Sequence, residues 1–501
     1  MPASPHAARW TFALVSAGGV VMTLDVTVVN VALAAIARDF DAGLDRVQWT
    51  VSAYSLAFGA LLLTAGALSD RIGRRAVFTA GMVLFTLASA ACGLAPDAGT
   101  LIVARAAQGL GGSMVFAPAL ALIAAAYEGA RRQAAIASFA AIASAAGALG
   151  PVVGGILVQT LGWRWIFLVN VPIGVLVVAG ALTRMPESAA PEHPRRLDPL
   201  GALLAVGALL ALHYPLTVGP EKGWTSPGVF LSATAGLTLA AALVASQRRP
   251  DGLIDMALLR IRALSGAAVL GFLARMTCLG VLAFVTLWLQ ATHDYSPLEV
   301  GLHLLPLTGS VLVAGMFVAR LQKLHPPQTL VAAGFAAQAL GLLALAAAAD
   351  GGPLLTATGL VLLGCGSAVI FPPLMGVAVG AVPADRAGMA SGLTNACYPL
   401  GTATGVAVFG ALFTARVDAG LSTAEGASAA QEATGTGQFG DIEPSLRPVA
   451  QEAFTDAFTA VCLASAALCL LGMLAARTLR PVPTSADTPV GRSLTGTAQA
   501  S

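Results

Sequence analysis

The sequence predicts an all-α polytopic membrane protein, and three observations lead to this fold class. Of the 501 residues, 57% are hydrophobic and only 10% are charged, whereas ordinary soluble domains carry roughly 25% charged residues. The apolar residues form long uninterrupted runs rather than the apolar–polar alternation of transmembrane barrel strands. At roughly 20 residues per crossing, the apolar share suffices for about fourteen helical spans.

Clusters of charged residues, proline and glycine separate the apolar runs and set the predicted helix boundaries. In chain order, the predicted helices cover residues 11–36, 47–68, 76–95, 100–126, 134–160, 164–184, 199–218, 227–246, 264–290, 297–319, 328–348, 353–381, 388–414 and 455–476. Asp198-Pro199 opens the seventh helix, and Gly219–Gly223 separates it from the eighth. The prediction of fourteen spans depends on this pair.

The predicted domain organisation is two six-helix bundles with two extra helices between them. The predicted units are an N-terminal tail over 1–9, a first bundle over 10–185, a linker over 186–262 that holds the helices 199–218 and 227–246, a second bundle over 263–480 with a long outer loop over 415–453, and a disordered tail over 481–501. The tail composition is polar and poor in aromatic residues, which is typical of disorder.

An internal repeat supports this division into two bundles. Gly66–Arg71 parallels Gly315–Arg320 at an offset of 249 residues, and Leu149–Gly154 parallels Leu400–Gly405 at an offset of 251. Further matches at an offset of 254 join Gly112-Ser113 to Gly366-Ser367, Pro118 to Pro372 and Arg132 to Arg386. Matches in the same order at corresponding helices indicate two homologous halves, as an alternating-access transporter requires.

Lys and Arg side chains set the predicted orientation, because positively charged loops remain in the cytoplasm. With the N-terminus inside, 19 of the 27 Lys and Arg residues lie on the inner side, 6 lie on the outer side, and Arg105 and Arg275 lie within the membrane. Both termini are therefore predicted to be cytoplasmic. The first apolar run is too long for a cleavable signal peptide and carries Asp25, so none is expected.

Several function classes find no support in the residue pattern. A net charge of +2, without a basic cluster interleaved with aromatic residues, argues against nucleic-acid binding. The six histidines are scattered without metal-ligand spacing, so neither a metal site nor a metalloenzyme is predicted. No Gly-x-x-x-x-Gly-Lys-Ser/Thr motif occurs, which excludes an ATP-driven pump within this chain. We therefore expect no enzymatic activity and no cofactor.

The first candidate site is a pair of opposite charges within the membrane, Asp25 on the first predicted helix and Arg105 on the fourth. A carboxylate at membrane depth is costly unless it is paired, protonated or in contact with water. A rise of 1.5 Å per residue separates the two depths by roughly 9 Å, within reach of a long Arg side chain assisted by Gln108. Asp25 is predicted to bind a coupling proton and Arg105 to set its affinity. The alternatives are a static ion pair and a carboxylate that caps local backbone.

The second candidate site is a gate in the loop over 66–75. Its members are Gly66, Asp70, Arg71, Gly73 and Arg74. The glycines permit close backbone approach and a tight turn. Asp70 can accept from a neighbouring helix N-terminus and pair with an Arg, a contact that one conformation makes and the other breaks. The alternative is a positively charged anchor on the inner side without a conformational role.

The third candidate is a glycine- and proline-rich segment in the middle of the fifth predicted helix. It contains Gly147, Gly150, Pro151 and Gly154. The proline removes a backbone hydrogen bond and bends the helix, and the glycines allow another helix to pack closely against it. The segment is predicted to act as a hinge or as a barrier to leakage, which is compatible with a role as a packing face.

Together with Trp163–Gly174, these motifs resemble the major facilitator superfamily in its fourteen-helix drug:proton antiporter branch (the EmrB/QacA type) over nearly the whole span from Trp10 to Arg480. The resemblance implies alternating access between two six-helix bundles, with protons entering as substrate leaves. It assigns residues 25–30, 66–75, 105–109 and 147–155 to the family's motifs, the last of which favours export over uptake.

The resemblance implies a proton-coupled multidrug or antibiotic efflux antiporter in a bacterial plasma membrane, with hydrophobic small molecules, protons and lipid as its partners, and we expect a monomer. A symporter that imports a small organic solute is the alternative on the same fold. Asn30, Gln108, Arg275 and Tyr398 are the predicted substrate-cavity residues.

Two positions depart from the family pattern. The second copy of the gate has Ala319 where Asp70 stands in the first, so the two gates differ electrostatically. Arg275 lies near the midplane on a helix without acidic residues; it either pairs with Asp25 across the cavity or contacts an anionic or carbonyl-rich substrate. Since the membrane core holds almost no carboxylate besides Asp25, we expect a neutral or anionic hydrophobic substrate.

Overall fold

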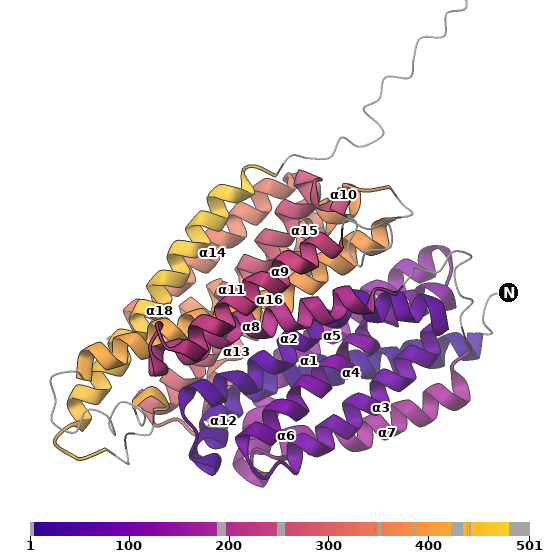
Figure 1. Cartoon of the computed structure of the whole chain (residues 1–501). Coiled ribbons are helices and arrows are strands. Elements are labelled where there is room, and N and C mark those ends of the chain that lie inside the picture. The colour runs from indigo at the N-terminus through magenta and orange to yellow at the C-terminus, as the bar shows by residue number, and fades with distance from the viewer. Residues whose placement is uncertain are drawn as a thin grey trace, which may run out of the picture.

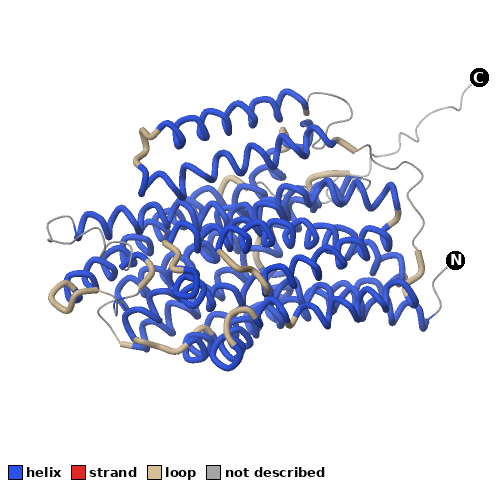
Figure 2. Tube along the Cα trace, turned by 60° about the horizontal axis from the view of Figure 1, so that its bottom comes forward, coloured by secondary structure: helices blue, strands red, loops and turns tan. Residues whose placement is uncertain are grey.

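The structure, a computed structural model, describes residues 5–187, 197–247, 256–348, 352–383, 386–421, 434–437, 439 and 442–479. Over these residues, the long regular elements are all helices, which Figure 2 shows running side by side. They form fourteen spans long and apolar enough to cross a membrane, two of which, Trp165–Arg184 and Pro297–Leu324, each combine two consecutive helices. The predicted all-α class and the predicted number of spans are confirmed.

The helices form two bundles with a helix pair between them (Figure 1). The first bundle contains α1 (Pro5–Phe40), α2 (Leu44–Ile72), α3 (Arg74–Gly93), α4 (Ala98–Ala126), α5 (Gly129–Leu161), α6 (Trp165–Leu168) and α7 (Asn170–Arg184). The pair consists of α8 (Pro199–Lys222) and α9 (Pro227–Ser246), and α10 (Met256–Leu259) is a short turn after it. The second bundle contains α11 (Arg262–His293), α12 (Pro297–His303), α13 (Leu305–Leu324), α14 (Pro327–Ala348), α15 (Pro353–Gly380), α16 (Ala387–Leu421) and α18 (Arg447–Ala476).

Several helix ends differ from those predicted. The first helix begins at Pro5, so most of the predicted N-terminal tail is helical. The predicted outer loop over 415–453 is shorter, because α16 continues to Leu421 and α18 begins at Arg447. The predicted boundaries followed hydropathy, whereas a helix continues into polar residues while its backbone hydrogen bonds are made. The predicted tail over 481–501 lies outside the described residues.

Two predicted helices are broken by a proline. The predicted helix over 297–319 is divided into α12 and α13 at Leu304, because Pro306 lacks the amide hydrogen that would bond to the carbonyl group of Leu302. The predicted helix over 164–184 is divided into α6 and α7 at Val169. Pro172 likewise lacks a donor for the carbonyl group of Leu168.

The two bundles meet where α1 packs against α11, α5 against α12 and α13, and α2 against α16. The extra helix α8 packs against both α2 and α16, and α9 lies against α8. Trp49 on α2 meets the buried His213 on α8 edge to face, with ring centroids 4.7 Å apart. The helix pair thus covers the line where α2 and α16 meet.

Candidate functional site

The centre of the candidate site is a buried ion pair inside the first bundle. The Nη1 atom of Arg105 on α4 lies 2.5 Å from Oδ2 of Asp25 on α1. Both side chains are 1% exposed. The sequence predicted that these two residues approach each other, and the structure places them in direct contact. Removing either partner would leave an uncompensated charge in the bundle interior.

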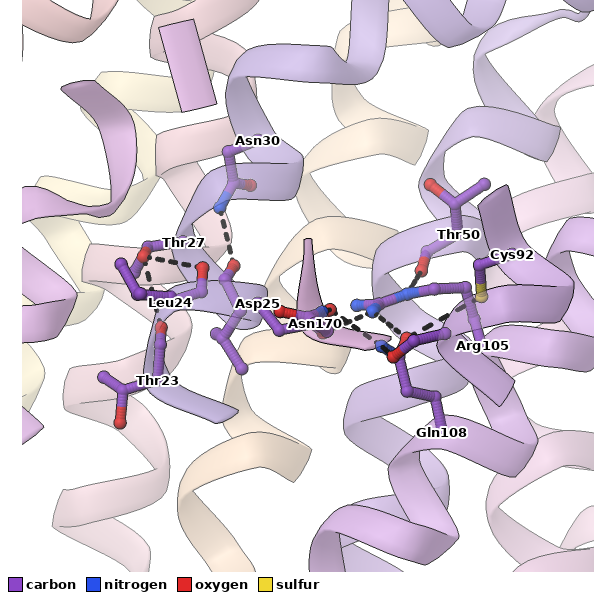
Figure 3. A network of polar contacts seen from close by, with 12 residues as sticks. Thr23, Leu24, Asp25, Thr27, Asn30, Thr50, Cys92, Arg105, Gln108 and Asn170 are labelled. Carbon is purple, nitrogen blue, oxygen red and sulfur yellow. Dashed lines mark hydrogen bonds and ion pairs between the residues drawn. The ribbon is translucent and has the colours of Figure 1, made fainter. Parts of the chain in front are cut away.

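Amide side chains from two further positions complete the coordination of Asp25 (Figure 3). Gln108 Nε2 donates to Oδ1 of Asp25 at 2.8 Å, and Asn170 Nδ2 on α7 donates to the same oxygen at 3.2 Å. Gln108 Oε1 in turn accepts from Nη1 of Arg105 at 2.6 Å. Gln108 Nε2 also donates to Oγ of Ser89 on α3 at 2.8 Å. A single carboxylate therefore links α1, α4, α7 and, through Gln108, α3.

Arg105 also binds α2, through its backbone and through an aromatic ring. Its Nε donates to the backbone carbonyl oxygen of Thr50 at 2.9 Å, and its guanidinium carbon lies 4.5 Å from the ring centroid of Tyr54. The close approach of α4 to α2 requires a glycine at 109, since a Cβ atom there would overlap the carbonyl group of Tyr54. The hydroxyl group of Tyr54 is buried without a hydrogen-bond partner.

Sequence reasoning did not identify Asn170 or Ser89 as members of this network. Asn170 belongs to the motif over 163–174, which supports the family resemblance but does not by itself predict a contact with Asp25. It is the polar residue where α7 begins, directly after the break at Val169, and a buried amide within an apolar span was the signal that could have found it. Ser89 offers no comparable signal, because α3 contains other small polar residues.

Two residues predicted to line a substrate cavity lie elsewhere in this structure. Gln108 is fully buried and its side chain belongs to the Asp25 network. Asn30 is also buried, donates from Nδ2 to the carbonyl group of Val26, and has an unpartnered Oδ1. The backbone carbonyl oxygen of Asn30 accepts from Thr286 on α11 at 3.0 Å. Asn30 therefore stands at the contact between the two bundles.

The second bundle contains a polar network that carries no charge. Gln338 on α14 donates to Oγ of Ser367 on α15 at 3.0 Å, and Ser367 donates to Sγ of Cys278 on α11 at 3.1 Å. Thr277 donates to Oε1 of Gln338 at 3.4 Å. Ser367 corresponds to Ser113 in the internal repeat. Corresponding helices of the two bundles thus carry a charged network in one and a neutral network in the other.

Arg275 on α11 does not pair with Asp25. Its guanidinium carbon lies 4.4 Å from the ring centroid of Phe371 and 5.8 Å from that of Tyr398, both in the second bundle. The interpretation that it reaches Asp25 is therefore wrong for this structure, in which Arg105, Gln108 and Asn170 occupy that carboxylate. A cation–π contact contributes about 2 kcal/mol when desolvated, whereas burying an unpaired ion costs several kcal/mol.

The predicted gate region forms a tight turn between α2 and α3. Arg74 pairs with Asp70 at 3.8 Å, within the same segment, while Arg71 is exposed. Gly73 has φ +109°, a conformation that favours glycine. Gly66 was predicted to permit close approach, but a Cβ atom there would meet nothing within 4 Å, so that prediction is wrong.

Glu187, which sequence reasoning missed, occupies the start of α3. Its Oε1 accepts from the backbone N–H of Arg75 at 3.0 Å, and its Oε2 lies 3.7 Å from Nε of the same arginine. Arg75 also donates from Nη1 to the backbone carbonyl oxygen of Met185 at 2.9 Å. A negative charge is stabilised at a helix N-terminus. Glu187 therefore takes the capping position that was predicted for Asp70.

The glycine- and proline-rich segment of α5 lies between α1 and the second bundle. A Cβ atom at Gly154 would lie 3.1 Å from the carbonyl oxygen of Val28, and one at Gly150 would overlap the side chain of Thr27. On the other side of α5, a Cβ atom at Gly301 would lie 2.5 Å from the carbonyl oxygen of Pro151. The predicted close packing of α5 is therefore present, and Pro151 lies inside the helix.

No metal site is visible in the part of the chain that the structure describes, where no three His, Cys, Asp or Glu side chains gather in a suitable group. The fold and the site define a class, a two-bundle membrane protein with a buried ion pair in its first half. One solved structure with this fold is a bacterial homolog of the human lysosomal transporter Spinster in an inward-facing and unoccupied conformation, with a TM-score of 0.67, 16% identity, and coverage of 96% of this chain and 100% of that one.

The chain belongs to the Major Facilitator Superfamily, whose family model matches residues 15–406. It is 38% identical to the multidrug resistance protein Stp of Mycobacterium tuberculosis (strain CDC 1551 / Oshkosh) over 400 residues, which cover 79% of this chain and 74% of that protein. It is 36% identical to the tetracenomycin C resistance and export protein of Streptomyces glaucescens over 425 residues, which cover 83% of this chain and 78% of that protein.

Proposed function

We propose that this protein exports hydrophobic small molecules, drugs or antibiotics among them, across the plasma membrane in exchange for protons. Its relatives with resistance or export in their names support the export of such compounds. The observation that carries the proton coupling is the Asp25–Arg105 pair, a titratable carboxylate with a fixed positive partner inside the bundle. The 19-to-6 distribution of Lys and Arg supports cytoplasmic termini.

Protonation of Asp25 is the coupling step in this proposal. The ionised carboxylate accepts from Arg105, Gln108 and Asn170, and so holds α4 and α7 against α1. A neutral carboxyl group loses the charge attraction, and Arg105 is then left as an uncompensated buried charge. The bundle must rearrange to give Arg105 another partner, and it returns when the proton is released.

The first helix transmits this rearrangement to the second bundle. Asn30, on the same helix as Asp25, accepts through its backbone from Thr286 on α11. The adjacent carbonyl group of Val31 accepts from Gln290 of α11 at 3.3 Å. A shift of α1 at Asp25 therefore acts directly on hydrogen bonds that join the two bundles. In this proposal, these hydrogen bonds belong to the two-state element that alternating access requires.

Import by a proton-coupled symporter is the alternative, because the fold permits either direction. The Gly-Pro segment of α5, which the family resemblance associates with export, lies at the contact between the bundles, where α5 packs against α1 and α12. The resistance and export proteins among the relatives also favour export. The direction of transport under an imposed gradient separates the two functions.

The test uses the full-length protein in proteoliposomes with an imposed pH gradient and a mixed panel of hydrophobic compounds. We expect counter-movement of at least one compound against the proton flow in the wild-type protein. Asp25→Asn abolishes this movement while the protein remains folded and inserted. The control Asp39→Asn removes a surface ion pair with Arg164 whose side chains are 41% and 39% exposed, and it leaves transport unchanged. Normal proton-driven movement in Asp25→Asn contradicts the coupling role.

A further inference from the structure

Arg275 is the feature of the second bundle that the proposed mechanism does not use. It lies 13 residues after Arg262, where α11 begins, which is about 20 Å along the helix axis. Its side chain is half-buried, and its Nε is enclosed without a hydrogen-bond partner. The hydroxyl group of Tyr398, whose ring faces the same guanidinium group, is also enclosed without a partner. Two donors of one cluster thus lack an acceptor.

Arg105 provides a comparison, because it is a buried arginine with hydrogen-bond and ion-pair partners as well as aromatic ones. Its guanidinium group lies over Tyr54 at 4.5 Å and Phe167 at 5.5 Å, and it also contacts the carboxylate of Asp25 and the amide of Gln108. Arg275 has the corresponding aromatic partners, with Phe371 at 4.4 Å and Tyr398 at 5.8 Å. In contrast with Arg105, it has no hydrogen bond and no ion pair among the described residues.

The three helices that carry Arg275, Phe371 and Tyr398 provide no anion at the depth of Arg275. Neither α11 nor α15 contains an acidic residue. The acidic residue of α16 is Asp418, 20 residues beyond Tyr398, which is about 30 Å along the helix axis. The neutral network of Gln338, Ser367 and Cys278 does not provide one either. Among the described residues, no acidic side chain forms an ion pair with Arg275, so the described part of the protein leaves its charge without an anion.

We propose that Arg275, Tyr398 and Phe371 form a subsite for the anionic group of an aromatic substrate, a carboxylate or an ionised phenol. The guanidinium fork matches a carboxylate in a bidentate arrangement. The hydroxyl group of Tyr398 provides a further donor, and the rings of Phe371 and Tyr398 offer apolar surface to the aromatic part of the substrate. The role of this subsite in transport rests on the proposed export function. The test of the subsite measures only binding, so it does not depend on transport.

The subsite has an electrical consequence for transport. Each proton that enters carries one positive charge inward. Export of a monovalent anion is electrically equivalent to a second positive charge moving inward, so the cycle moves two charges in total. Export of a neutral substrate adds no charge, so that cycle moves only one. An interior-negative potential therefore drives the export of an anionic substrate more strongly than that of a neutral one. A potassium diffusion potential set with valinomycin is expected to accelerate transport of an aromatic carboxylate more than that of its carboxamide.

The binding test uses the full-length purified protein at pH 7 with two matched probes, naphthalene-2-carboxylate and naphthalene-2-carboxamide, in equilibrium dialysis. We expect the wild-type protein to bind the carboxylate at least about tenfold more tightly than the carboxamide. Arg275→Gln makes the two affinities equal, and Arg275→Lys keeps part of the preference because it keeps the charge. Tyr398→Phe weakens carboxylate binding severalfold and leaves carboxamide binding unchanged. Arg416→Gln, which changes an exposed arginine on α16, serves as the control.

The proposal is overturned if the wild-type protein binds neither probe, if it binds both equally, or if Arg275→Gln retains the preference for the carboxylate. Asp25→Asn separates this result from the coupling mechanism, because it is expected to abolish proton-driven transport and to keep the ratio of the two affinities. Normal transport by Asp25→Asn would refute the coupling role of Asp25. If Arg275→Gln nevertheless loses the preference for the carboxylate over the carboxamide, the subsite is still supported.

Discussion

The hydroxyl group of Thr286 on α11 donates to the backbone carbonyl oxygen of Asn30 on α1 at 3.0 Å, and both residues are buried. This hydrogen bond joins the two bundles five positions along α1 from the buried carboxylate of Asp25. The distance between the proton-binding side chain and the contact between the bundles is therefore less than two helical turns. Coupling between them needs no long pathway through the protein.

Thr286→Val is expected to loosen the contact between α1 and α11. The substitution preserves shape but removes a hydroxyl donor that the carbonyl groups of Asn30 and Ala283 share, and one neutral hydrogen bond contributes at most about 1 kcal/mol. A shift of at most about fivefold in the equilibrium between closed and open contact follows from that energy. Spin labels at residues 41 and 294, after the ends of the two helices, report the change as a broader distance distribution. Thr358→Val, which removes a bond within α15 at the exposed surface, leaves the distribution unchanged.

Arg105→Ala is expected to destabilise the protein by about 3–5 kcal/mol, because the carboxylate of Asp25 remains buried without its partner. The double variant Asp25→Asn with Arg105→Gln removes both charges and recovers part of this loss. Thermal unfolding in detergent measures both. Arg164→Ala breaks an exposed pair with Asp39 and cation–π contacts with Phe40 and Trp163, and it costs about 1–2 kcal/mol. A double variant as unstable as Arg105→Ala would show that charge burial is not the source of the loss.

Gly150→Ala is expected to disturb the packing of α5 on α1, since the new methyl group overlaps the side chain of Thr27. Overpacking of this kind costs about 1–3 kcal/mol. Gly66→Ala provides a matched comparison, because its methyl group meets nothing within 4 Å, and it stays within about 0.5 kcal/mol of the wild type. Unfolding temperatures of the two variants distinguish packing from helix propensity. Equal shifts would rule out close packing at Gly150.

Glu187→Ala is expected to weaken the start of α3. The substitution removes the acceptor for the backbone N–H of Arg75 and the negative charge at the helix N-terminus, together about 1 kcal/mol. Glu187→Gln keeps an acceptor and loses only the charge, so it has the smaller effect. Hydrogen exchange at the first turn of α3 measures the difference. Unchanged exchange in Glu187→Ala would contradict the capping role. Glu452→Ala, an exposed glutamate on α18, is the control.

The ion pair was predictable from sequence because a charge inside a membrane needs a partner. Asp25 and Arg105 were the acidic and basic residues at suitable depth on the first and fourth helices, which left few arrangements open. Asn170 was harder to assign, since it follows a helix break that hydropathy does not register. Glu187 was harder still, because the chain between α7 and α8 is polar and gives no sign of where it folds back. Long-range contacts of this kind depend on tertiary packing.

The glycine positions also show that contacts between distant parts of the chain could not be predicted from the sequence. The sequence marked Gly66 and Gly150 alike, as small residues inside motifs, but only Gly150 lies against a neighbouring helix. The helix breaks at Val169 and Leu304 were not predicted either, although Pro172 and Pro306, which cause them, are local features of the sequence. Hydropathy places the membrane spans, but it shows neither where a span is interrupted nor which helix packs against it.

The position of α8 makes the two flanks of the molecule unlike. It packs against α2 and α16, with His213 turned toward Trp49. On that flank, a helix that belongs to neither bundle therefore covers the contact between the bundles. On the opposite flank, where α5 meets α12 and α13, no extra helix covers the contact among the described residues. A compound that diffuses within the bilayer therefore meets helices of the two bundles directly on one flank and α8 on the other.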